Sequence, residues 1–169
     1  MSLEDFLKDI DNLPWTDSEL AHQMAERLME RYRGDLPVMV ANWLETHPPI
    51  ATRTAELHSW LLVDSQPWTL KLNQLIPSPV VGKRSENVHN HMRPLTSMTL
   101  CGGYRQNYYD TEALLHYKLG DQFAFDDLPC YEGPSTKPGM IYTIHPRIFH
   151  ALTDFEDGTL TLCLYGPLA

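Results

Sequence analysis

The sequence predicts a mainly β protein, a single-domain sandwich or barrel of short antiparallel strands with a small helical cap at its N-terminus. Up to about His47, apolar residues recur at helical spacing. After Thr52 the pattern changes to short β-rich runs separated by turn residues. The 169 residues allow one domain with a sizeable core and are too few for two. We therefore expect a helical segment, 1–51, packed on a barrel of residues 52–169, as one structural domain.

The N-terminal segment is expected to form three helices. The first begins at Ser2 and ends at Asn12. The second begins with a capping box, Thr16-Asp17-Ser18-Glu19, and ends near Gly34, which suits a helix C-cap. The third follows directly, and His47-Pro48-Pro49 stops it. Each helix carries an apolar stripe, as expected for helices that pack on another element.

Short β-rich runs make up the rest of the chain, and their close spacing is typical of an antiparallel sandwich or small barrel. One loop, Asp126–Pro138, is long, and loops of that length are often functional or mobile. The expected strands are Trp60–Val63, Thr69–Ile76, Val88–His91, Ser97–Tyr109, Ala113–Leu119, Gln122–Phe125, Met140–Ile144, Ile148–Leu152 and Thr159–Tyr165.

Composition excludes several classes of partner. The formal charge is −9 without a basic stripe, which argues against nucleic acid, because phosphate binding relies on clustered Lys and Arg. No apolar run approaches the ~20 residues of a membrane span, and the acidic N-terminus lacks an export leader. The three cysteines are widely spaced and odd in number, which argues against a disulfide framework. We expect a cytoplasmic protein, monomeric or homodimeric, that binds a small molecule.

The most informative residues are His89 and His91, together with His150 far downstream. If Val88 to Met92 is a strand, both imidazoles point to one face, because side chains alternate along a strand. Two imidazoles on one face can hold a metal ion when a third ligand arrives from another strand, and His150 is the candidate. The alternatives are a pair of polar residues on an exposed strand and a core histidine with ordinary hydrogen bonds.

This arrangement resembles the cupin superfamily, whose fold is a double-stranded β-helix, or jelly-roll barrel. The first cupin motif corresponds to Gly82–Gly103, and the second runs from Pro138-Gly139 to His150. In the common cupin pattern, a glutamate follows the paired histidines and is a fourth ligand. Here that region reads Met92-Arg93-Pro94-Leu95-Thr96, which has no carboxylate. The departure indicates a three-histidine site.

Within the cupins, the chain resembles the cysteine dioxygenase type of thiol dioxygenase. The resemblance covers most of the chain, including Leu62-Val63-Asp64, the three histidines and the ending Leu160–Pro167. It implies that His89, His91 and His150 bind Fe(II) and that Tyr165 is the active-site tyrosine. The implied activity is that of a mononuclear non-haem iron(II) dioxygenase, which adds O2 to a small, metal-chelating substrate containing a thiol.

The chain departs from this family at three places. The family's last strand carries serine, histidine and tyrosine, and here these positions are Thr161, Cys163 and Tyr165. The cysteine that is cross-linked to the tyrosine in animal members falls at Thr96, so no such cross-link can form. The arginine that binds the substrate carboxylate falls near Trp60. The resemblance therefore does not imply cysteine itself as the substrate.

Residue chemistry agrees with such a site. Three neutral imidazoles leave a divalent ion its full charge and open positions, which favours an anionic, chelating substrate. Thr161, Cys163 and Tyr165 share one face of the last strand by alternation, so the Tyr165 hydroxyl can donate a hydrogen bond or act as an acid. Arg93 can pair with a substrate carboxylate, with Arg105 and Arg147 as rivals. Ordinary core packing, or an exposed arginine, is the alternative for each. The expected pocket residues are Trp60, Arg93, Thr96, Tyr104, Thr161 and Cys163.

Two other functions fit the same sequence. A three-histidine cupin can act on a non-thiol substrate, by cleaving carbon–carbon bonds of diketone-type compounds or by redox-neutral Lewis-acid chemistry. A cupin can also bind a small molecule without catalysis. Fe(II) is the expected metal and O2 the expected co-substrate, with Ni, Zn or Mn as replacements in a purified sample, because imidazole binds several of these ions.

Overall fold

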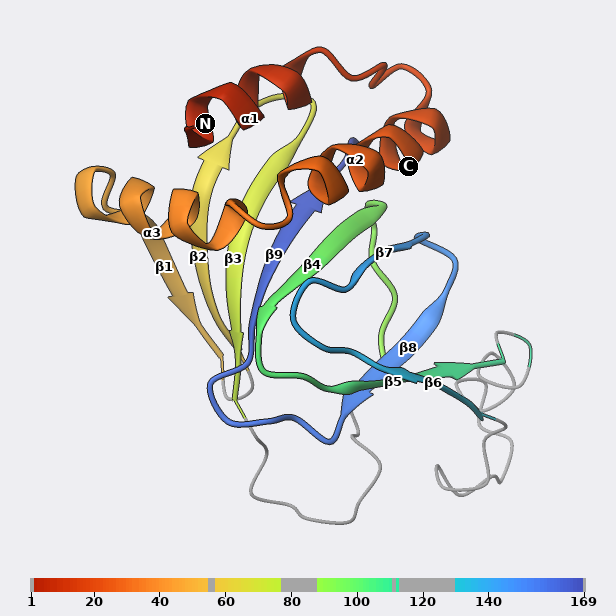
Figure 1. Ribbon diagram of the computed structural model, residues 1–169. Helices are drawn as coiled ribbons and strands as arrows, with labels where there is room; N and C mark the ends of the chain where they lie inside the picture. The colour runs from red at the N-terminus through yellow and green to blue at the C-terminus, as the bar shows by residue number, and fades with distance from the viewer. Residues whose placement is uncertain (1, 55–56, 77–87, 111, 113–129, 169) are drawn as a thin grey trace.

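The computed structural model describes residues 2–54, 57–76, 88–110, 112 and 130–168, and this part of the chain forms three helices and nine strands (Figure 1). In chain order they are α1 (Leu3–Asp11), α2 (Ser18–Tyr32), α3 (Leu36–Thr46), β1 (Ile50–Arg53), β2 (Leu57–Asp64), β3 (Thr69–Leu75), β4 (Leu95–Cys101), β5 (Arg105–Tyr109), β6 (Cys130–Ser135), β7 (Ile141–Ile144), β8 (Phe149–Thr153) and β9 (Leu160–Tyr165).

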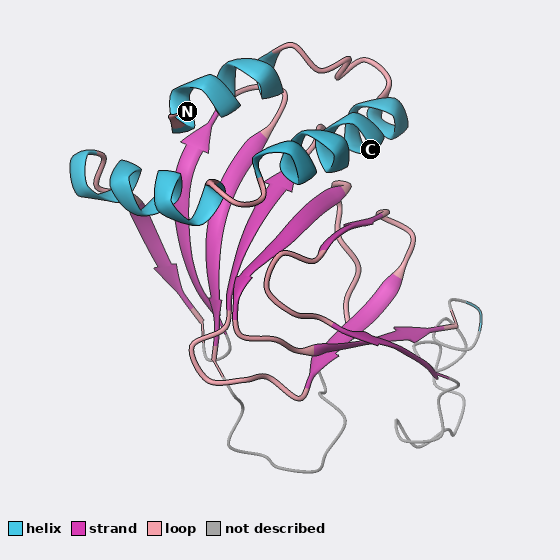
Figure 2. Cartoon of the chain, viewed as in Figure 1, coloured by secondary structure: helices cyan, strands magenta, loops and turns pink. Residues whose placement is uncertain are grey.

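The strands form two antiparallel sheets. A six-stranded sheet has the order β1-β2-β3-β9-β4-β7, and a three-stranded sheet has the order β6-β5-β8. The helices gather along one side of the larger sheet, and the smaller sheet lies beyond its other side (Figure 2). This mainly β architecture with an N-terminal helical cap is the one that the sequence predicts.

The hydrophobic core lies between the helices and the larger sheet. Strand alternation supplies its sheet side, because Leu70 and Leu72 of β3 and Leu162 and Leu164 of β9 all point toward the helices. The helices supply residues such as Phe6, which is fully buried. Each fully buried apolar side chain of this size contributes about 1.5–3 kcal/mol to folding. The core thus fixes the cap on one face of the sheet and leaves the other face for polar residues.

That second face carries polar side chains from neighbouring strands. In the β3–β9 register, Lys71 lies opposite Cys163 and Asn73 lies opposite Thr161. Ser97 of β4 lies on the other side of Cys163. These residues form the barrel wall that faces the smaller sheet, as the alternation along the last strand indicated.

Helix caps differ in one detail from the expectation. Ser2 and Asp5 form a reciprocal capping box at the start of α1. At α2 the N-cap is Asp17 rather than Thr16, because the Asp17 carboxylate accepts the amide of Leu20 at 3.1 Å.

Several strand predictions need correction. The expected strand Val88–His91 is reduced to an isolated bridge between His89 and His150. The expected strand Ser97–Tyr109 is two strands in different sheets, separated at Gly102, where the positive φ of 68° turns the chain. Strand β6 occupies part of the expected loop Asp126–Pro138. The expected strands Ala113–Leu119 and Gln122–Phe125 lie outside the described residues.

Strand β1 was not predicted, and the proposed division after residue 51 falls inside it. All four of its residues are exposed at the sheet edge, so its sequence lacks the alternation of apolar and polar residues that a buried face produces.

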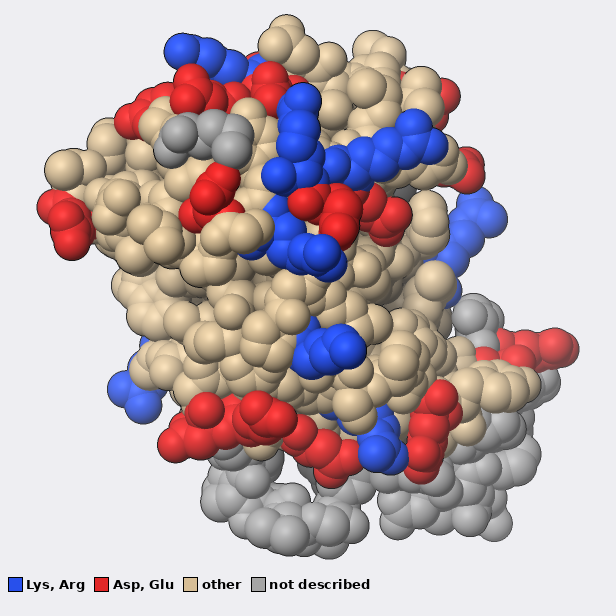
Figure 3. Space-filling model, viewed as in Figure 1, with Lys and Arg blue, Asp and Glu red and all other residues tan. Residues whose placement is uncertain are grey.

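Among the described residues, no helix is long and apolar enough to span a bilayer. On the face shown in Figure 3, acidic side chains lie directly beside the basic side chains near the helices, and further acidic side chains gather at the lower edge.

Candidate metal centre

The structure brings His89, His91 and His150 together. One ligand atom from each lies within 4.8 Å of the others. Nε2 of His91 and Nε2 of His150 are 3.0 Å apart. The ring centroid of His89 is 5.0 Å from that of His91 and 4.6 Å from that of His150. The two cupin-like motifs therefore meet at one group of imidazoles, as the sequence predicts.

Backbone pairing explains how residues so distant in sequence meet. The amide of His89 donates to the carbonyl of His150 at 3.0 Å, and the amide of His150 donates to that of His89 at 2.9 Å. Directly opposed residues of an antiparallel pair place their side chains on the same face. His150 is held in β8, whose neighbour β5 places Tyr108 opposite it. A single bridge thus anchors His89, and His91 follows two residues later on the same side.

The imidazoles of His91 and His150 are neutral at neutral pH. Burial, with the neighbouring His89, lowers the pKa of His91 to about 4. Burial, followed by His89 and His91, lowers the pKa of His150 to about 3. A neutral imidazole has a free lone pair, so these side chains are ready to bind a metal ion.

The donor set fits a divalent transition metal. Metal–nitrogen bonds are about 2.0–2.1 Å long, so one ion can reach two nitrogens separated by the observed 3.0 Å. Nδ1 of His150 is buried and has no hydrogen-bond partner among the residues described. The group contains no carboxylate, so nitrogen-binding ions such as Fe, Ni or Zn suit it better than Ca or Mg.

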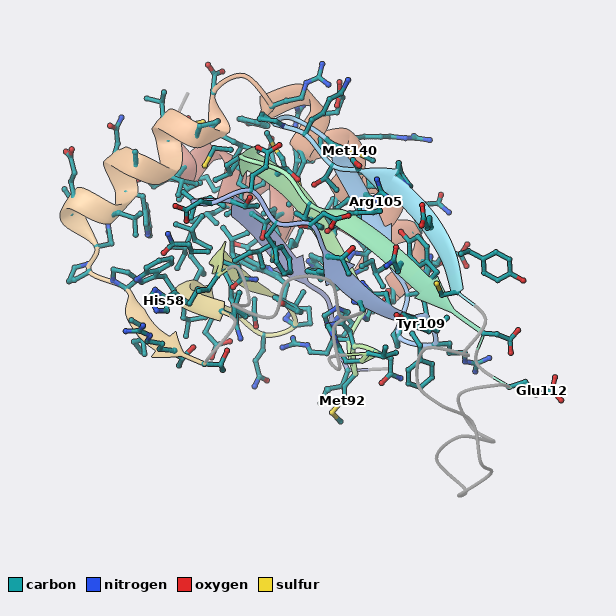
Figure 4. All side chains as sticks on the ribbon, turned by 90° about the horizontal axis from the view of Figure 1, so that it is seen from below. His58, Met92, Arg105, Tyr109, Glu112 and Met140 are labelled. Carbon is teal, nitrogen blue, oxygen red and sulfur yellow. The ribbon has the colours of Figure 1, made fainter. Side chains whose placement is uncertain are left out.

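A cavity of about 390 Å³ lies beside the histidines. Its size is that of a site for a small molecule. Met92, at its rim, is 79% exposed and points outward at the edge of the molecule (Figure 4). The cavity is lined by Leu61, Asp64, Thr69, Lys71, His91, Met92, Arg93 and Tyr165.

Tyr165 lines the cavity and lies next to the histidine group. Its ring centroid is 6.2 Å from that of His91, and both side chains line the cavity. Burial raises the pKa of the Tyr165 phenol above its ordinary value. The hydroxyl is therefore protonated at neutral pH and can donate a hydrogen bond into the cavity.

Arg93 also lines the cavity, but the protein itself uses its guanidinium. Nε donates to the carbonyl of Gly166, Nη1 donates to Oγ1 of Thr69 at 3.2 Å, and Nη2 donates to the carbonyl of Pro67 at 3.2 Å. These contacts hold Arg93 against the end of β9. Its charge reaches the cavity, while three of its N–H groups are already engaged.

The rival arginines lie elsewhere. Arg105, on the smaller sheet, forms ion pairs with Glu132 at 2.9 Å and Asp154 at 3.6 Å. Figure 4 shows Arg105 well apart from Met92, which lies at the cavity. Arg147 is exposed in the turn before β8, and neither side chain lines the cavity.

Cys163, Thr161 and Tyr104 lie deeper in the barrel. The Cys163 thiol is 3.4 Å from the Thr161 hydroxyl, and it accepts a hydrogen bond from Asn73 at 3.3 Å. Burial raises the pKa of the Cys163 thiol, so it stays protonated. The Tyr104 phenol is hydrogen-bonded to the phenol of Tyr142. The structure places these residues behind the cavity as a polar interior.

Trp60 and Thr96 do not reach this interior. Ser59 points into the barrel, where its hydroxyl donates to Asn73 at 2.7 Å, so Trp60 points to the other face and packs on the hydrophobic core. Thr96 likewise faces the helices, and its hydroxyl lies 2.6 Å from Nδ1 of His22 in α2. The pocket placement of both residues is therefore corrected, because each lies on the cap side of the sheet.

Three residues of the site carry no functional signal in the sequence. Lys71 lines the cavity, although an isolated lysine in a β-rich run gave no functional signal. Asn73 and Tyr142 join the polar interior, and only the strand register reveals this.

No protein-family model matches the chain, and no curated protein matches it. Solved structures of cupins do resemble it. A tryptophan-to-phenylalanine variant of the oxalate decarboxylase of Bacillus subtilis is 11% identical, with a TM-score of 0.50, over 72% of this chain and 28% of that chain. The oxalate decarboxylase formate complex of Lactobacillus farciminis is 11% identical, with a TM-score of 0.49, over 72% of this chain and 31% of that one. KdgF from Halomonas sp. is 11% identical, with a TM-score of 0.47, over 71% of this chain and 89% of that one.

The first of these likenesses shows the fold. The chain has a cupin fold that carries a three-histidine group able to hold a metal ion. It spans less than a third of the length of the oxalate decarboxylase chains that it matches.

Proposed function

We propose that this protein is a mononuclear non-haem iron(II) dioxygenase that adds O2 to a small substrate containing a thiol. The observation that carries the proposal is the meeting of His89, His91 and His150 within 4.8 Å, beside a cavity that a tyrosine also lines. The resemblance of the residue pattern to thiol dioxygenases supplies the reaction class.

The three histidines would hold the metal. Fe(II), when bound, supplies Lewis acidity and one-electron reactivity toward O2. Because the group consists of three imidazoles and, among the described residues, no carboxylate joins it, these ligands leave the positive charge of the ion uncompensated. A thiolate is favoured at such a site, because it brings the missing negative charge.

Tyr165 would orient the reacting groups. Its protonated phenol faces the cavity next to His91, so it can donate a hydrogen bond to oxygen or to the substrate. The Thr69 hydroxyl accepts a hydrogen bond from Arg93 and donates one to Asp64 at 3.1 Å. These two hydrogen bonds hold the side chains of Arg93 and Asp64 at the cavity wall. Behind this wall Cys163 and its hydroxyl neighbours Ser97 and Thr161 keep the interior polar, and Cys163 stands where the thiol dioxygenases have their relay histidine.

The proposal is tested with purified protein loaded anaerobically with Fe(II). O2 uptake is measured with a panel of small thiols, and the products are analysed by mass spectrometry for addition of two oxygen atoms. We expect turnover of at least one thiol. His150→Ala should abolish both metal retention and turnover.

A matched control is His145→Ala, because His145 is exposed in the turn before β8 and lies outside the three-histidine group. This variant should keep its metal and its turnover. Wild-type protein that binds Fe(II) at the three histidines, but consumes O2 with none of the thiols, would contradict the thiol dioxygenase proposal.

A second candidate keeps the metal and changes the reaction. Trp60 faces the cap, Cys163 replaces the relay histidine, and three N–H groups of Arg93 are engaged by the protein. These three differences from the thiol dioxygenases favour a non-thiol substrate. It would be a dicarbonyl compound, either cleaved with O2 or transformed by Lewis-acid chemistry. Turnover of enolisable dicarbonyls with Zn(II) and without O2 would support the Lewis-acid form. A protein that only binds a ligand would be stabilised by it without forming product.

A further inference from the structure

Strand β1 lies at an edge of the larger sheet, and among the described residues only β2 pairs with it. All four residues of β1, Ile50–Arg53, are exposed, and Ile50 is 69% exposed. The outer edge of a sheet presents backbone N–H and C=O groups that can pair with a strand of another chain. The edge of β1 is therefore a candidate interaction surface.

The hydrogen bonds between β1 and β2 define which backbone groups of β1 point outward. The amide of Thr54 donates to the carbonyl of Leu57 at 2.8 Å, so these two residues form a hydrogen-bonded pair. Hydrogen-bonded and non-hydrogen-bonded pairs alternate along an antiparallel ladder. In the observed register, Thr52 is therefore bonded to β2, whereas Ala51 and Arg53 direct their N–H and C=O groups away from it.

The sequence of β1 lacks features that protect sheet edges from such pairing. Proline, lysine and β-bulges are common devices at protected edges. The edge strand β6 of the smaller sheet contains Glu132 and Pro134, and its pairing with β5 has a register irregularity. β1 contains no proline, pairs with β2 in a continuous register, and has one charged residue, Arg53. Its edge is therefore open to a neighbouring strand.

The outward groups of β1 are complementary to those of a second, antiparallel copy of β1. When Thr52 lies opposite Thr52 of the other copy, Ala51 of each copy lies opposite Arg53 of the other. Each of these two pairs can exchange two backbone hydrogen bonds. The two Thr52 side chains then face each other in a non-hydrogen-bonded pair, where they are close enough to interact.

The two neighbouring symmetric registers fit less well. If Ala51 lay opposite its own copy, Arg53 would face Pro49, which has no N–H to donate. If Arg53 lay opposite its own copy, two like charges would oppose each other. The register centred on Thr52 avoids both defects, so the sequence of β1 favours one symmetric pairing.

Helix α3 adds an apolar surface beside this edge. It leads into β1 through His47-Pro48-Pro49, and Figures 1 and 4 show both elements on the same side of the molecule. Its outer face carries Val38, Ala41, Asn42 and Glu45 at helical spacing. All four are exposed, and Val38 is 62% exposed. This face can extend the small area that a four-residue strand pair buries.

We propose that β1 pairs with β1 of a second copy of this chain, so that the protein forms a symmetric homodimer with one sheet continuing through both copies. A two-fold axis perpendicular to the sheet relates the copies, because opposed residues of antiparallel strands point to the same face. Both helical caps therefore lie on one face of the joined sheet, with α3 of each copy beside the joined strands. The inference concerns assembly and is independent of the proposed reaction.

Sedimentation equilibrium of the full chain tests the inference. Wild-type protein should form dimers with a dissociation constant on the order of 10 μM, because the interface is at the small end of the usual range. Ala51→Pro removes an outward N–H from each copy and no bond to β2, so it should raise this constant roughly 10-fold or more. Ala51→Val keeps the N–H and should dimerise as the wild type does.

The register is tested at Thr52, which faces its own copy in the proposed dimer. Thr52→Lys and Thr52→Glu should each weaken dimerisation roughly 5-fold, because like charges then lie opposite each other. An equimolar mixture of the two variants should form mixed dimers in preference to either homodimer, as measured by native mass spectrometry. Because Thr52 is exposed, these variants decide the question if Ala51→Pro fails to fold.

Weaker dimers in these three variants, together with a preference for mixed Lys–Glu pairs, would support the inference. Wild-type protein that stays monomeric at its highest attainable concentration would overturn it. Dimers that persist unchanged in folded Ala51→Pro protein, or Lys and Glu variants that show no preference for each other, would also overturn it.

Discussion

Nε2 of His91 and Nε2 of His150 lie 3.0 Å apart, although 59 positions separate the two residues in the chain. Both imidazoles are neutral at neutral pH, because burial lowers the pKa values of these side chains to about 4 and about 3. Two lone pairs held this close favour a shared cation.

Metal binding should stabilise the fold. A ligand that binds only the native state raises the free energy of unfolding by about 2.7 kcal/mol when its concentration is 100 times its dissociation constant. We expect Zn(II) or anaerobic Fe(II) to raise the melting temperature of protein stripped with a chelator, as measured by scanning calorimetry. The shift should vanish in His89→Ala and persist in His145→Ala. An equal shift in both variants would indicate that the stabilising ion binds elsewhere.

Tyr165→Phe should reduce turnover and spare metal binding. The phenol lies beside His91 but is not part of the three-histidine group. A positioned hydrogen-bond donor or acid contributes on the order of 100-fold to rate, so kcat should fall by about that factor. Steady-state O2 consumption and metal content measure the two effects. Tyr131→Phe is the matched control, because Tyr131 is 69% exposed on β6. Loss of metal in Tyr165→Phe would assign the residue a structural role.

Thr96→Val should destabilise the fold without changing the reaction. The Thr96 hydroxyl contacts Nδ1 of His22 at 2.6 Å and the Thr143 hydroxyl at 2.9 Å, on the side of the sheet that faces the helices. A buried polar atom left without its partner costs about 1–3 kcal/mol, so urea unfolding should show a loss of that size. Thr96→Ser should lose less, because it keeps the hydroxyl. A large fall in kcat for Thr96→Val in folded protein would return this residue to the pocket.

His22 should make stability depend on pH. Burial, and to a smaller extent His145, lowers the pKa of His22 from 6.5 to about 4. Between these values the unfolded chain binds a proton that the folded chain does not, so the free energy of unfolding falls as the pH drops from 6.5 to 4. The full loss is about 3 kcal/mol, which is reached below pH 4.

The measurement is urea unfolding of metal-free protein at several pH values. His22→Asn keeps a group able to bond Thr96 and removes the titration, so its profile should be flatter by about that amount. Comparison with the wild type isolates His22 from His91 and His150, whose pKa values are also lowered. Parallel profiles for the two proteins would contradict the prediction.

Alternation along single strands predicted much of the fold and of the site. In β9 it separated Leu162 and Leu164, which pack on the helices, from Cys163 and Tyr165, which face the interior. The two-residue spacing of His89 and His91 placed both imidazoles on one side, even though only one residue pairs with a neighbouring strand. Local periodicity was enough to predict the orientation of a strand where its buried face consists of regularly spaced apolar residues.

The faces on which Trp60 and Thr96 lie depend on strand register and on contacts with the helices, which the sequence of a single strand does not reveal. A shift of one residue moves a side chain to the opposite face of a sheet, and β2 contains a register irregularity between Leu61 and Val63. The partner of Thr96, His22, comes from a helix 74 positions earlier, and nothing near either residue indicates that contact. Lys71 was missed for a related reason, because its neighbour Tyr165 reaches it across the β3–β9 pair.

The central claim, a metal ion held by His89, His91 and His150, is tested most directly by anomalous diffraction at the iron edge from crystals of Fe(II)-loaded protein. The account predicts one anomalous peak per chain, at bonding distance from a nitrogen of each of the three imidazoles. A peak at another site, or no peak in crystals grown from protein that received Fe(II), would contradict it.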